Sequence, residues 1–413
     1  YPNLTNFQVF GCSGITQLSC MNNQLTSLDL TGCNALESVH FSSNQFTSLD
    51  LSGFTSLIDM NIDNNPLTSL DISGCTGLTG SIHVHGGLGP GHPNLTNLQV
   101  FGCSGITELE CFDNQLTSLD FTGCSNLESI WCTDNQLTSL DLTGCNSLTF
   151  LDCGSNQFTS LDLSNNTSLI TLYCGINQIT NLDLSNNILL EELTVHVNPN
   201  IVLDLSNNTA LKHLDCQQCQ MTTLDLSNNT ALETLNCHTN QLVSLDIRNG
   251  FNTNVSSFTT SGNPNLFCIS VDDAAWSTAN WTSIDAWTSF DNNCEAKTYV
   301  PDDNFENFLE THDSLGNTVP FGDPSAMGDG IAFNDSVLTA NISSVDSLEI
   351  SGGINISDIT GIDGFASLEF LKVHNPNNIS SIDFTSNVNL NYLHLATPTL
   401  NSLDLSNNLN LDY

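Results

Sequence analysis

The sequence repeats with a period of 21 residues, and this period constrains the fold more than any other feature. Aspartates mark one step of the repeat, at Asp120, Asp141, Asp162, Asp183, Asp204, Asp225 and Asp246, each 21 residues after the previous one. Each copy follows the pattern LxxLxCxxNxLTSLDLSxNTx, with apolar residues at fixed positions. A unit of this length cannot bury its leucines alone, so the copies must stack as the rungs of a solenoid.

The spacing inside one copy predicts the structure of a rung. The alternation in Leu172–Cys174 predicts a short strand in which Tyr173 faces outward. Asn177 follows at a turn, where its side chain can bond to backbone groups of the turn and of neighbouring rungs. Leu182–Leu184 alternates again and predicts a second short strand on the opposite wall. Because 21 residues leave little room for a helix, we expect a mostly β fold with short strands on both walls.

This spacing resembles that of leucine-rich repeats, and the LxxLDL half resembles their short bacterial class. On this basis residues 1–265 form a leucine-rich-repeat array, with a Gly- and His-rich insertion at about residues 79–93. Residues 266–297 lack the LDL step and hold three of the four tryptophans, which indicates an aromatic cap and a linker. Residues 298–345 form a small, partly helical domain, and residues 346–413 start a second array that stops without a cap.

Two segments resemble the caps of leucine-rich-repeat cassettes in extracellular Bacteroidota surface proteins. The run CISVDDAAWSTANW, residues 268–281, resembles the C-terminal cap, and VPDDNFE, residues 300–306, resembles the N-terminal cap. The first resemblance implies a disulfide between Cys268 and Cys294, with two unpaired thiols as the alternative. In the second segment we expect Asp303 to cap a helix whose apolar stripe is Phe305, Phe308 and Leu309. The resemblance also implies a giant, adhesin-like protein of which this chain is an internal piece.

Most of the sixteen cysteines fall into two columns of the repeat. The strand column is Cys20, Cys111, Cys132, Cys153, Cys174, Cys216 and Cys237, and the turn column is Cys12, Cys33, Cys75, Cys103, Cys124 and Cys145. Phe, Ile or Val replaces cysteine in some copies, so we expect small apolar core sites with free thiols. Disulfides between rungs are the alternative, which parallel Cβ vectors disfavour.

The charge of the chain excludes two classes of partner. Four basic residues stand against 44 acidic ones, for a formal net charge of −40. Binding to nucleic acid or to an anionic membrane requires lysine and arginine, so neither is expected as a partner. The sequence also has no apolar run of the length that membrane insertion requires.

The column of aspartates places like charges roughly 5 Å apart, so their repulsion must be offset by hydrogen bonds or by a bound metal ion. Each carboxylate could accept bonds from a hydroxyl or amide of the adjoining rung, or calcium could bridge pairs of them. Asp302, Asp303 and Asp329 are weaker calcium candidates. His83 and His85 could share a zinc site, although a solvated loop explains them as well. No other cofactor is expected.

The polar residues recur as columns and do not converge as catalytic groups would, so we expect no enzyme. The outward positions of the first strand are the expected binding wall, and aromatic and acidic residues gather there: Phe112, Trp131, Phe150, Asp152 and Tyr173. Aromatic faces beside carboxylates suit sugar rings, whereas scattered surface apolar residues would need no function.

Three tripeptides resemble the O-glycosylation acceptor of exported Bacteroidota proteins, which implies glycans at Ser314, Ser336 and Ser347. Together these features predict a non-enzymatic, extracellular segment of a cell-surface adhesin that binds surface glycans or proteins through its strand face. The alternative is a structural spacer in a filament or surface layer, which contacts only neighbouring cassettes of the same protein.

Overall fold

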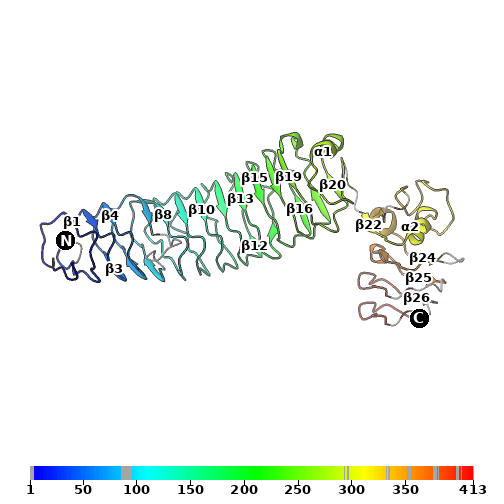
Figure 1. The fold of residues 1–413 in the computed structure, drawn as a ribbon. Helices are drawn as coiled ribbons and strands as arrows, with labels where there is room; N and C mark the ends of the chain where they lie inside the picture. Colours follow the sequence, from blue (N-terminus) through cyan, green and yellow to red (C-terminus); the bar gives the residue numbers. More distant parts are fainter. Residues whose placement is uncertain are drawn as a thin grey trace. The chain divides into compact units, whose positions relative to one another are not determined.

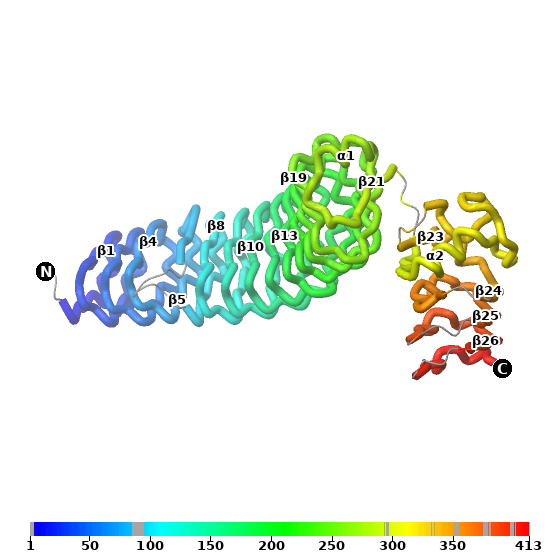
Figure 2. Tube along the Cα trace, turned by 45° about the vertical axis from the view of Figure 1, so that its right-hand side comes forward, coloured from blue at the N-terminus to red at the C-terminus, as the bar shows by residue number. Residues whose placement is uncertain are grey.

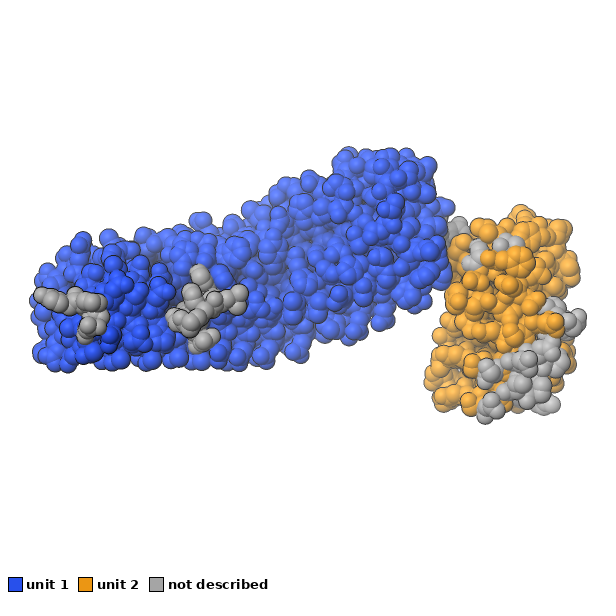
Figure 3. Space-filling model, viewed as in Figure 1, with its two compact units in different colours: residues 1–292 blue, residues 293–413 orange. Residues whose placement is uncertain are grey.

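The computed structural model describes residues 4–84, 95–292, 294, 297–331, 333, 335–350, 355–374, 379, 381–396, 400 and 402–412. Residues 85–93 of the predicted insertion, with His85, lie outside the described residues. The chain divides into two compact units, residues 1–292 and residues 293–413 (Figure 3). Each unit is a stack of rungs with its own core.

The first wall of the first unit is built from short parallel strands, one to a rung (Figure 1). Three strands pair at its start: β1 (Gln17–Ser19), β2 (Ser38–His40) and β4 (Asp59–Asn61). Nine then form one sheet: β6 (Gly80–His83), β8 (Ile106–Glu110), β9 (Ser129–Trp131), β10 (Phe150–Asp152), β11 (Thr171–Tyr173), β13 (Glu192–Thr194), β15 (His213–Asp215), β17 (Thr234–Asn236) and β19 (Ser257–Thr259). Equivalent leucines are in register, as Leu151 is with Leu172, so the repeat fixes the pairing.

The second wall is less regular than the repeat predicts. Its strands are β3 (Ser48–Asp50), β5 (Ser69–Asp71), β7 (Asn97–Gln99), β12 (Asn181–Leu182), β14 (Val202–Leu203), β16 (Thr223–Asp225) and β18 (Ser244–Asp246). Between β7 and β12, only an isolated bridge joins Asp120 to Asp141. The mostly β solenoid predicted from the repeat is confirmed, with an interrupted second wall.

A ladder of buried asparagines joins each rung to the previous one, as the repeat predicts. The Asn177 side-chain oxygen accepts the Phe158 amide at 3.0 Å. Its amide group donates to the carbonyls of Cys153, Cys174 and Gly175 at 3.1–3.2 Å. The bond to Phe158 satisfies a buried amide that would otherwise have no partner.

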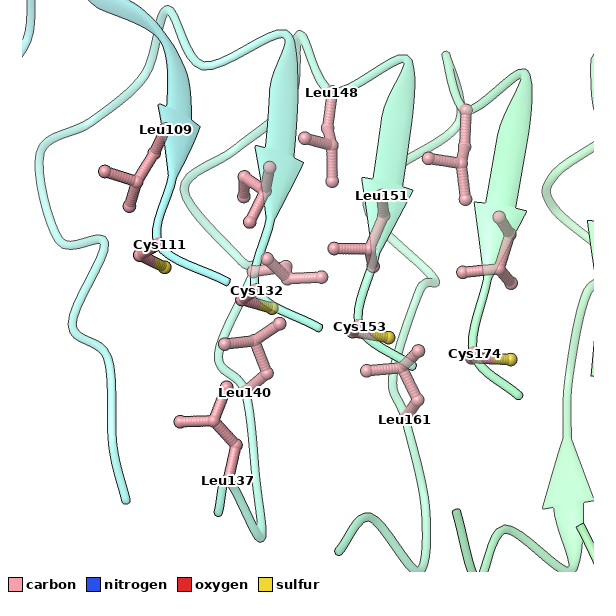
Figure 4. Close-up of a cluster of buried hydrophobic side chains, with 14 of the residues drawn as sticks. Leu109, Cys111, Cys132, Leu137, Leu140, Leu148, Leu151, Cys153, Leu161 and Cys174 are labelled. Carbon is pink, nitrogen blue, oxygen red and sulfur yellow. The ribbon is translucent and has the colours of Figure 1, made fainter. Parts of the chain in front are cut away.

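The strand-column cysteines lie in the core beside the leucines (Figure 4). Fourteen cysteines, including all members of both columns, are free thiols. Cys12 is exposed, contrary to the prediction of a core site.

The turn column differs from the apolar site that the sequence predicts. The Cys124 thiol donates to the Val100 carbonyl, 24 residues earlier, at 3.2 Å. Two rungs after Cys145 the column holds Asn187, whose amide donates to the equivalent Leu163 carbonyl. A thiol therefore substitutes for an amide as a donor here. Cys219, which belongs to neither column, replaces an asparagine of the ladder in the same way and donates to the Val195 carbonyl.

The aspartate column is bonded within each rung and not to the adjoining rung. The Asp183 carboxylate accepts the amide of Ser185, two residues later, at 2.9 Å. Hydrogen bonds from the Ser185 hydroxyl and amide hold the pKa of Asp183 below its usual value, despite weak repulsion from Asp162 and Asp204. The donor to each aspartate therefore lies in the same rung, two residues after the aspartate.

The first unit ends in an aromatic cap. Strands β20 (Cys268–Ser270) and β21 (Ser289–Asp291) extend the second wall, with α1 (Ala274–Asn280) between them and the short helix η1 (Asn252–Asn254) beside α1. Trp281 stacks on Phe258 with ring centroids 4.2 Å apart, and its indole N–H donates to the Val255 carbonyl. Cys268 and Cys294 are disulfide-bonded.

The second unit begins with β22 (Lys297–Tyr299), which pairs antiparallel with β23 (Ser336–Leu338). Its helices are α2 (Asp303–Glu310), α3 (Thr339–Ser343) and η2 (Ile362–Gly364), and its array contributes β24 (Ser347–Ile350), β25 (Phe370–Val373) and β26 (Tyr392–Leu395) (Figure 2). The predicted apolar stripe of α2 is buried. Its cap is Asp302 and not Asp303, because the Asp302 carboxylate accepts the amides of Asn304 and Phe305.

Candidate ligand-binding groove on the strand face

A groove of about 670 Å³ lies on the first wall of the first unit, over strands β10 to β19. It opens where two glycines, Gly154 and Gly175, follow the strand-column cysteines of neighbouring rungs. In the flanking rungs the same position carries the larger residues Thr133 and His196. The His196 ring packs against Gly175 so closely that a Cβ at that position would lie 2.6 Å from it. The groove therefore takes its shape from the two glycines and from the His196 ring, which occupies the place of a side chain at position 175.

The predicted aromatic residues form a cluster at one end of the groove. Trp131, Asp152 and Tyr173 are aligned in one column across β9, β10 and β11, as the repeat predicts. Trp131 stacks on Phe150 with ring centroids 4.2 Å apart, and Tyr173 meets the edge of Phe150 at 5.6 Å. Asp152 and Tyr173 line the groove. Phe112 is partly exposed in the rung before Trp131.

This packing changes the surface that a ligand would meet. Trp131 and Phe150 each cover one face of the other, so a sugar ring could not stack between them. The indole N–H of Trp131 is buried without a hydrogen-bond partner. The Tyr173 hydroxyl donates to the Glu192 carboxylate, and burial together with this bond raises the pKa of Tyr173 to about 12. Of this cluster only Tyr173 lines the groove, and Trp131 and Phe150 lie beside it.

Three carboxylates line the groove: Asp152, Glu192 and Asp215. Burial raises the pKa of the Asp152 carboxyl, and the amide of Gly154, 3.2 Å away, offsets part of this effect. The Asp215 carboxylate accepts the Gln217 amide at 3.2 Å and the Asn236 side chain at 3.3 Å. The donors around these carboxylates are neutral hydrogen-bonding groups.

All four lysines and arginines of the chain are described, and each is paired with an acid outside the groove. The pairs are Lys212–Glu191, Arg248–Asp246, Lys297–Asp329 and Lys372–Glu349, with N–O distances of 2.5–2.8 Å. None of these basic residues lines the groove. The carboxylates of the groove are therefore not neutralised by a lysine or arginine of the chain.

Several groove residues could not be recognised from the repeat pattern. His196 and His213 both line the groove, and the Nδ1 atom of His196 is buried without a partner. The Asn236 side-chain oxygen is also buried without a partner. The signal for this region in the sequence is the position after the strand-column cysteine, where Gly154 and Gly175 interrupt a series of larger residues.

The predicted calcium candidates have other roles and do not come together. Asp302 caps α2 and also accepts the amides of Ser357 and Asp358. Asp329 pairs with Lys297 at 2.8 Å. Asp303 instead lies with Glu306 and Asp335, whose carboxylate oxygens are within 4.8 Å of one another. Calcium prefers six to eight oxygen ligands, so three carboxylates alone are an incomplete set.

The predicted glycosylation sites differ in accessibility. Ser314 and Ser347 are exposed. Ser336 is only 3% exposed, because β23 pairs with β22. A glycan on Ser336 does not fit this packing, whereas the Ser314 and Ser347 side chains are accessible for modification. None of the helices in the described segments has the length and apolar composition needed to cross a membrane.

No known family model matches the chain, and no curated protein does. Among solved structures, the functional domain of InlJ from Listeria monocytogenes, which includes a cysteine ladder, is 26% identical with a TM-score of 0.47. That match covers 92% of this chain, which spans only 62% of the InlJ chain. The L. monocytogenes internalin InlF is 21% identical, with a TM-score of 0.40, over 68% of this chain and 88% of InlF. YopM, a leucine-rich effector of Yersinia pestis, is 22% identical, with a TM-score of 0.43, over 61% of this chain and 71% of YopM.

Proposed function

We propose that this chain is a non-enzymatic recognition segment of an extracellular, cell-surface adhesin, and that the groove on its strand face receives the ligand, a surface protein or glycan. The observation that carries the proposal is the groove itself. A spacer needs only the buried leucines and asparagines of each rung, and its outward residues are free to be small and polar. At this place the outward residues instead form a hollow lined by Tyr173 and by three carboxylates that pair with no lysine or arginine of the chain.

Two features support an extracellular location. The cap contains a disulfide between Cys268 and Cys294, and disulfides persist in oxidising compartments. The net charge of −40 suits a soluble surface exposed to salt. The resemblance of both caps to Bacteroidota surface proteins agrees with this proposal.

Recognition fits the groove better than catalysis does. Within the groove, the arrangement most like a base and nucleophile pair is the His213 ring 2.9 Å from the Thr234 hydroxyl. Among the described residues, no group bonds to the second ring nitrogen of His213 to orient it as a base.

The test compares two variants that add the same side chain at equivalent positions of the repeat. Gly154→Leu fills the groove, and Ser42→Leu adds leucine at the same rung position far outside it. The chain is probed on arrays of surface glycans and extracellular proteins, and circular dichroism checks that both variants fold. We expect Gly154→Leu to lose the ligands that the wild-type chain and Ser42→Leu retain. Equal retention by both variants, or no ligand for the wild type, would favour the spacer.

A further inference from the structure

We propose that the groove binds a basic segment of a protein partner, with lysine or arginine side chains placed against Asp152, Glu192 and Asp215. This inference rests on the proposed function and narrows its ligand. The three carboxylates lie on β10, β13 and β15, and the four lysines and arginines of the chain are paired with acids outside the groove. A partner that supplies the cations would complete the electrostatics of the groove.

The spacing of the carboxylates defines the segment. Asp152 and Asp215 share a column and are three strand spacings apart, or about 14 Å. In an extended peptide, side chains four residues apart point the same way and are separated by about 13 Å. Two basic residues in the pattern Lys-x-x-x-Lys therefore match the two ends of the groove, with Glu192 between them.

A residue at the groove edge supports an apolar contact with such a segment. Ile176 lines the groove and is 49% exposed, with a φ of +55°. Apart from Val197 and Thr239, the described non-glycine residues at this turn position are unbranched and polar: Asn22, Ser43, Asn64, Asp113, Asp134, Ser155 and Gln218. Ile176 therefore presents an exposed apolar side chain at a position where most rungs present a polar one. Its exposed side chain would contact the aliphatic stem of a bound lysine or arginine.

A neutral sugar fits these observations less well. Trp131 and Phe150 stack on each other and do not line the groove, so Tyr173 is the one ring of this cluster that a sugar in the groove would meet. A neutral ligand would also exclude water from the three carboxylates without supplying a compensating charge. Both effects favour a cationic ligand.

The experiment uses the full chain and two fluorescent peptides of neutral Ser and Thr background, one with Lys-x-x-x-Lys and one with glutamine at both positions. Binding is followed by fluorescence anisotropy at low and high salt. We expect the lysine peptide to bind at least about tenfold more tightly than the glutamine peptide, and to weaken with salt because screening reduces its attraction to the groove.

Two triple variants with the same change of charge locate the binding site. D152N/E192Q/D215N removes the charges of the groove, whereas D162N/D183N/D204N removes three exposed charges of the opposite wall. We expect the groove variant to lose at least about tenfold in affinity, and the opposite-wall variant to stay within about twofold. Carbodiimide coupling of the lysine peptide, read by mass spectrometry, should join it to Asp152, Glu192 or Asp215.

The outcomes separate this inference from the proposed function. Equal losses in the two triple variants would mean that the peptide responds to net charge, and would overturn the inference. Failure of the lysine peptide to bind would also overturn it. If in that case Gly154→Leu still abolishes binding of a glycan or of a neutral protein, the groove is a ligand site of different chemistry and the proposed function stands.

Discussion

Replacing Asn177 with alanine should destabilise the first unit by about 3 kcal/mol. The mutation removes the oxygen that accepts the Phe158 amide, and no other described group takes its place. A buried amide without a partner costs about 1–3 kcal/mol. The three carbonyls that Asn177 serves each keep another donor, from Asn156, Asn198 and the Ser155 amide, so they add only about 1 kcal/mol through weakened bonding.

The assay is urea unfolding followed by far-ultraviolet circular dichroism, with hydrogen exchange at the Phe158 amide as a local readout. The matched control is Asn165→Ala, since Asn165 belongs to the same repeat, is exposed and makes only a 3.5 Å contact with Ser164. The control should change stability by less than about 0.5 kcal/mol. The reasoning is refuted if Asn177→Ala unfolds within about 0.5 kcal/mol of the wild type at an unchanged urea slope.

Three further predictions follow from the rungs and the cap. Native alkylation should modify Cys12 and spare Cys153, because burial raises the pKa of the Cys153 thiol well above its usual value. Labelling of Cys153 in the folded chain would contradict this expectation. The substitution Cys153→Val should lower the free energy of unfolding by less than about 1.5 kcal/mol. Hydrogen bonds lower the folded-state pKa of column aspartates such as Asp183. Their contribution to the free energy of unfolding is therefore complete above the unfolded pKa near 3.9 and is lost as the pH falls through the folded pKa. Acid titration should destabilise the array below about pH 4, and Asp183→Asn should reduce this pH dependence. Intact-mass analysis of native material should find glycans on peptides with Ser314 or Ser347 and none on Ser336, and a glycan on Ser336 would show that modification precedes folding.

The repeat predicts those features that depend on translation from one rung to the next. Asn177 and the buried leucines follow directly, because each position meets its own equivalent in the adjoining rung. The column shared by Trp131, Asp152 and Tyr173 follows for the same reason. The period of the repeat and the residue types at its positions were sufficient to predict these features.

Features that depend on local geometry were not predicted. The donor to Asp183 lies in its own rung because the turn after it brings the Ser185 amide within reach, and the spacing of the repeat does not determine that turn. The groove depends on side chains that are absent at Gly154 and Gly175 and on how His196 packs. The burial of Ser336 depends on a strand pairing between segments that the repeat does not cover.

The hydrogen bonds between rungs determine how the first unit would respond to a pulling force. These bonds run along the stacking direction, as the amide of Cys153 does to the carbonyl of Tyr173 at 2.8 Å. Force applied along that direction loads one rung at a time, so the array should lengthen in steps as rungs detach. Each released rung of 21 residues extends to about 70 Å, compared with about 5 Å in the stack. The Cys268–Cys294 bridge would hold the residues between them out of this extension. A surface protein built in this way would absorb mechanical work through its repeats while its cap stayed closed.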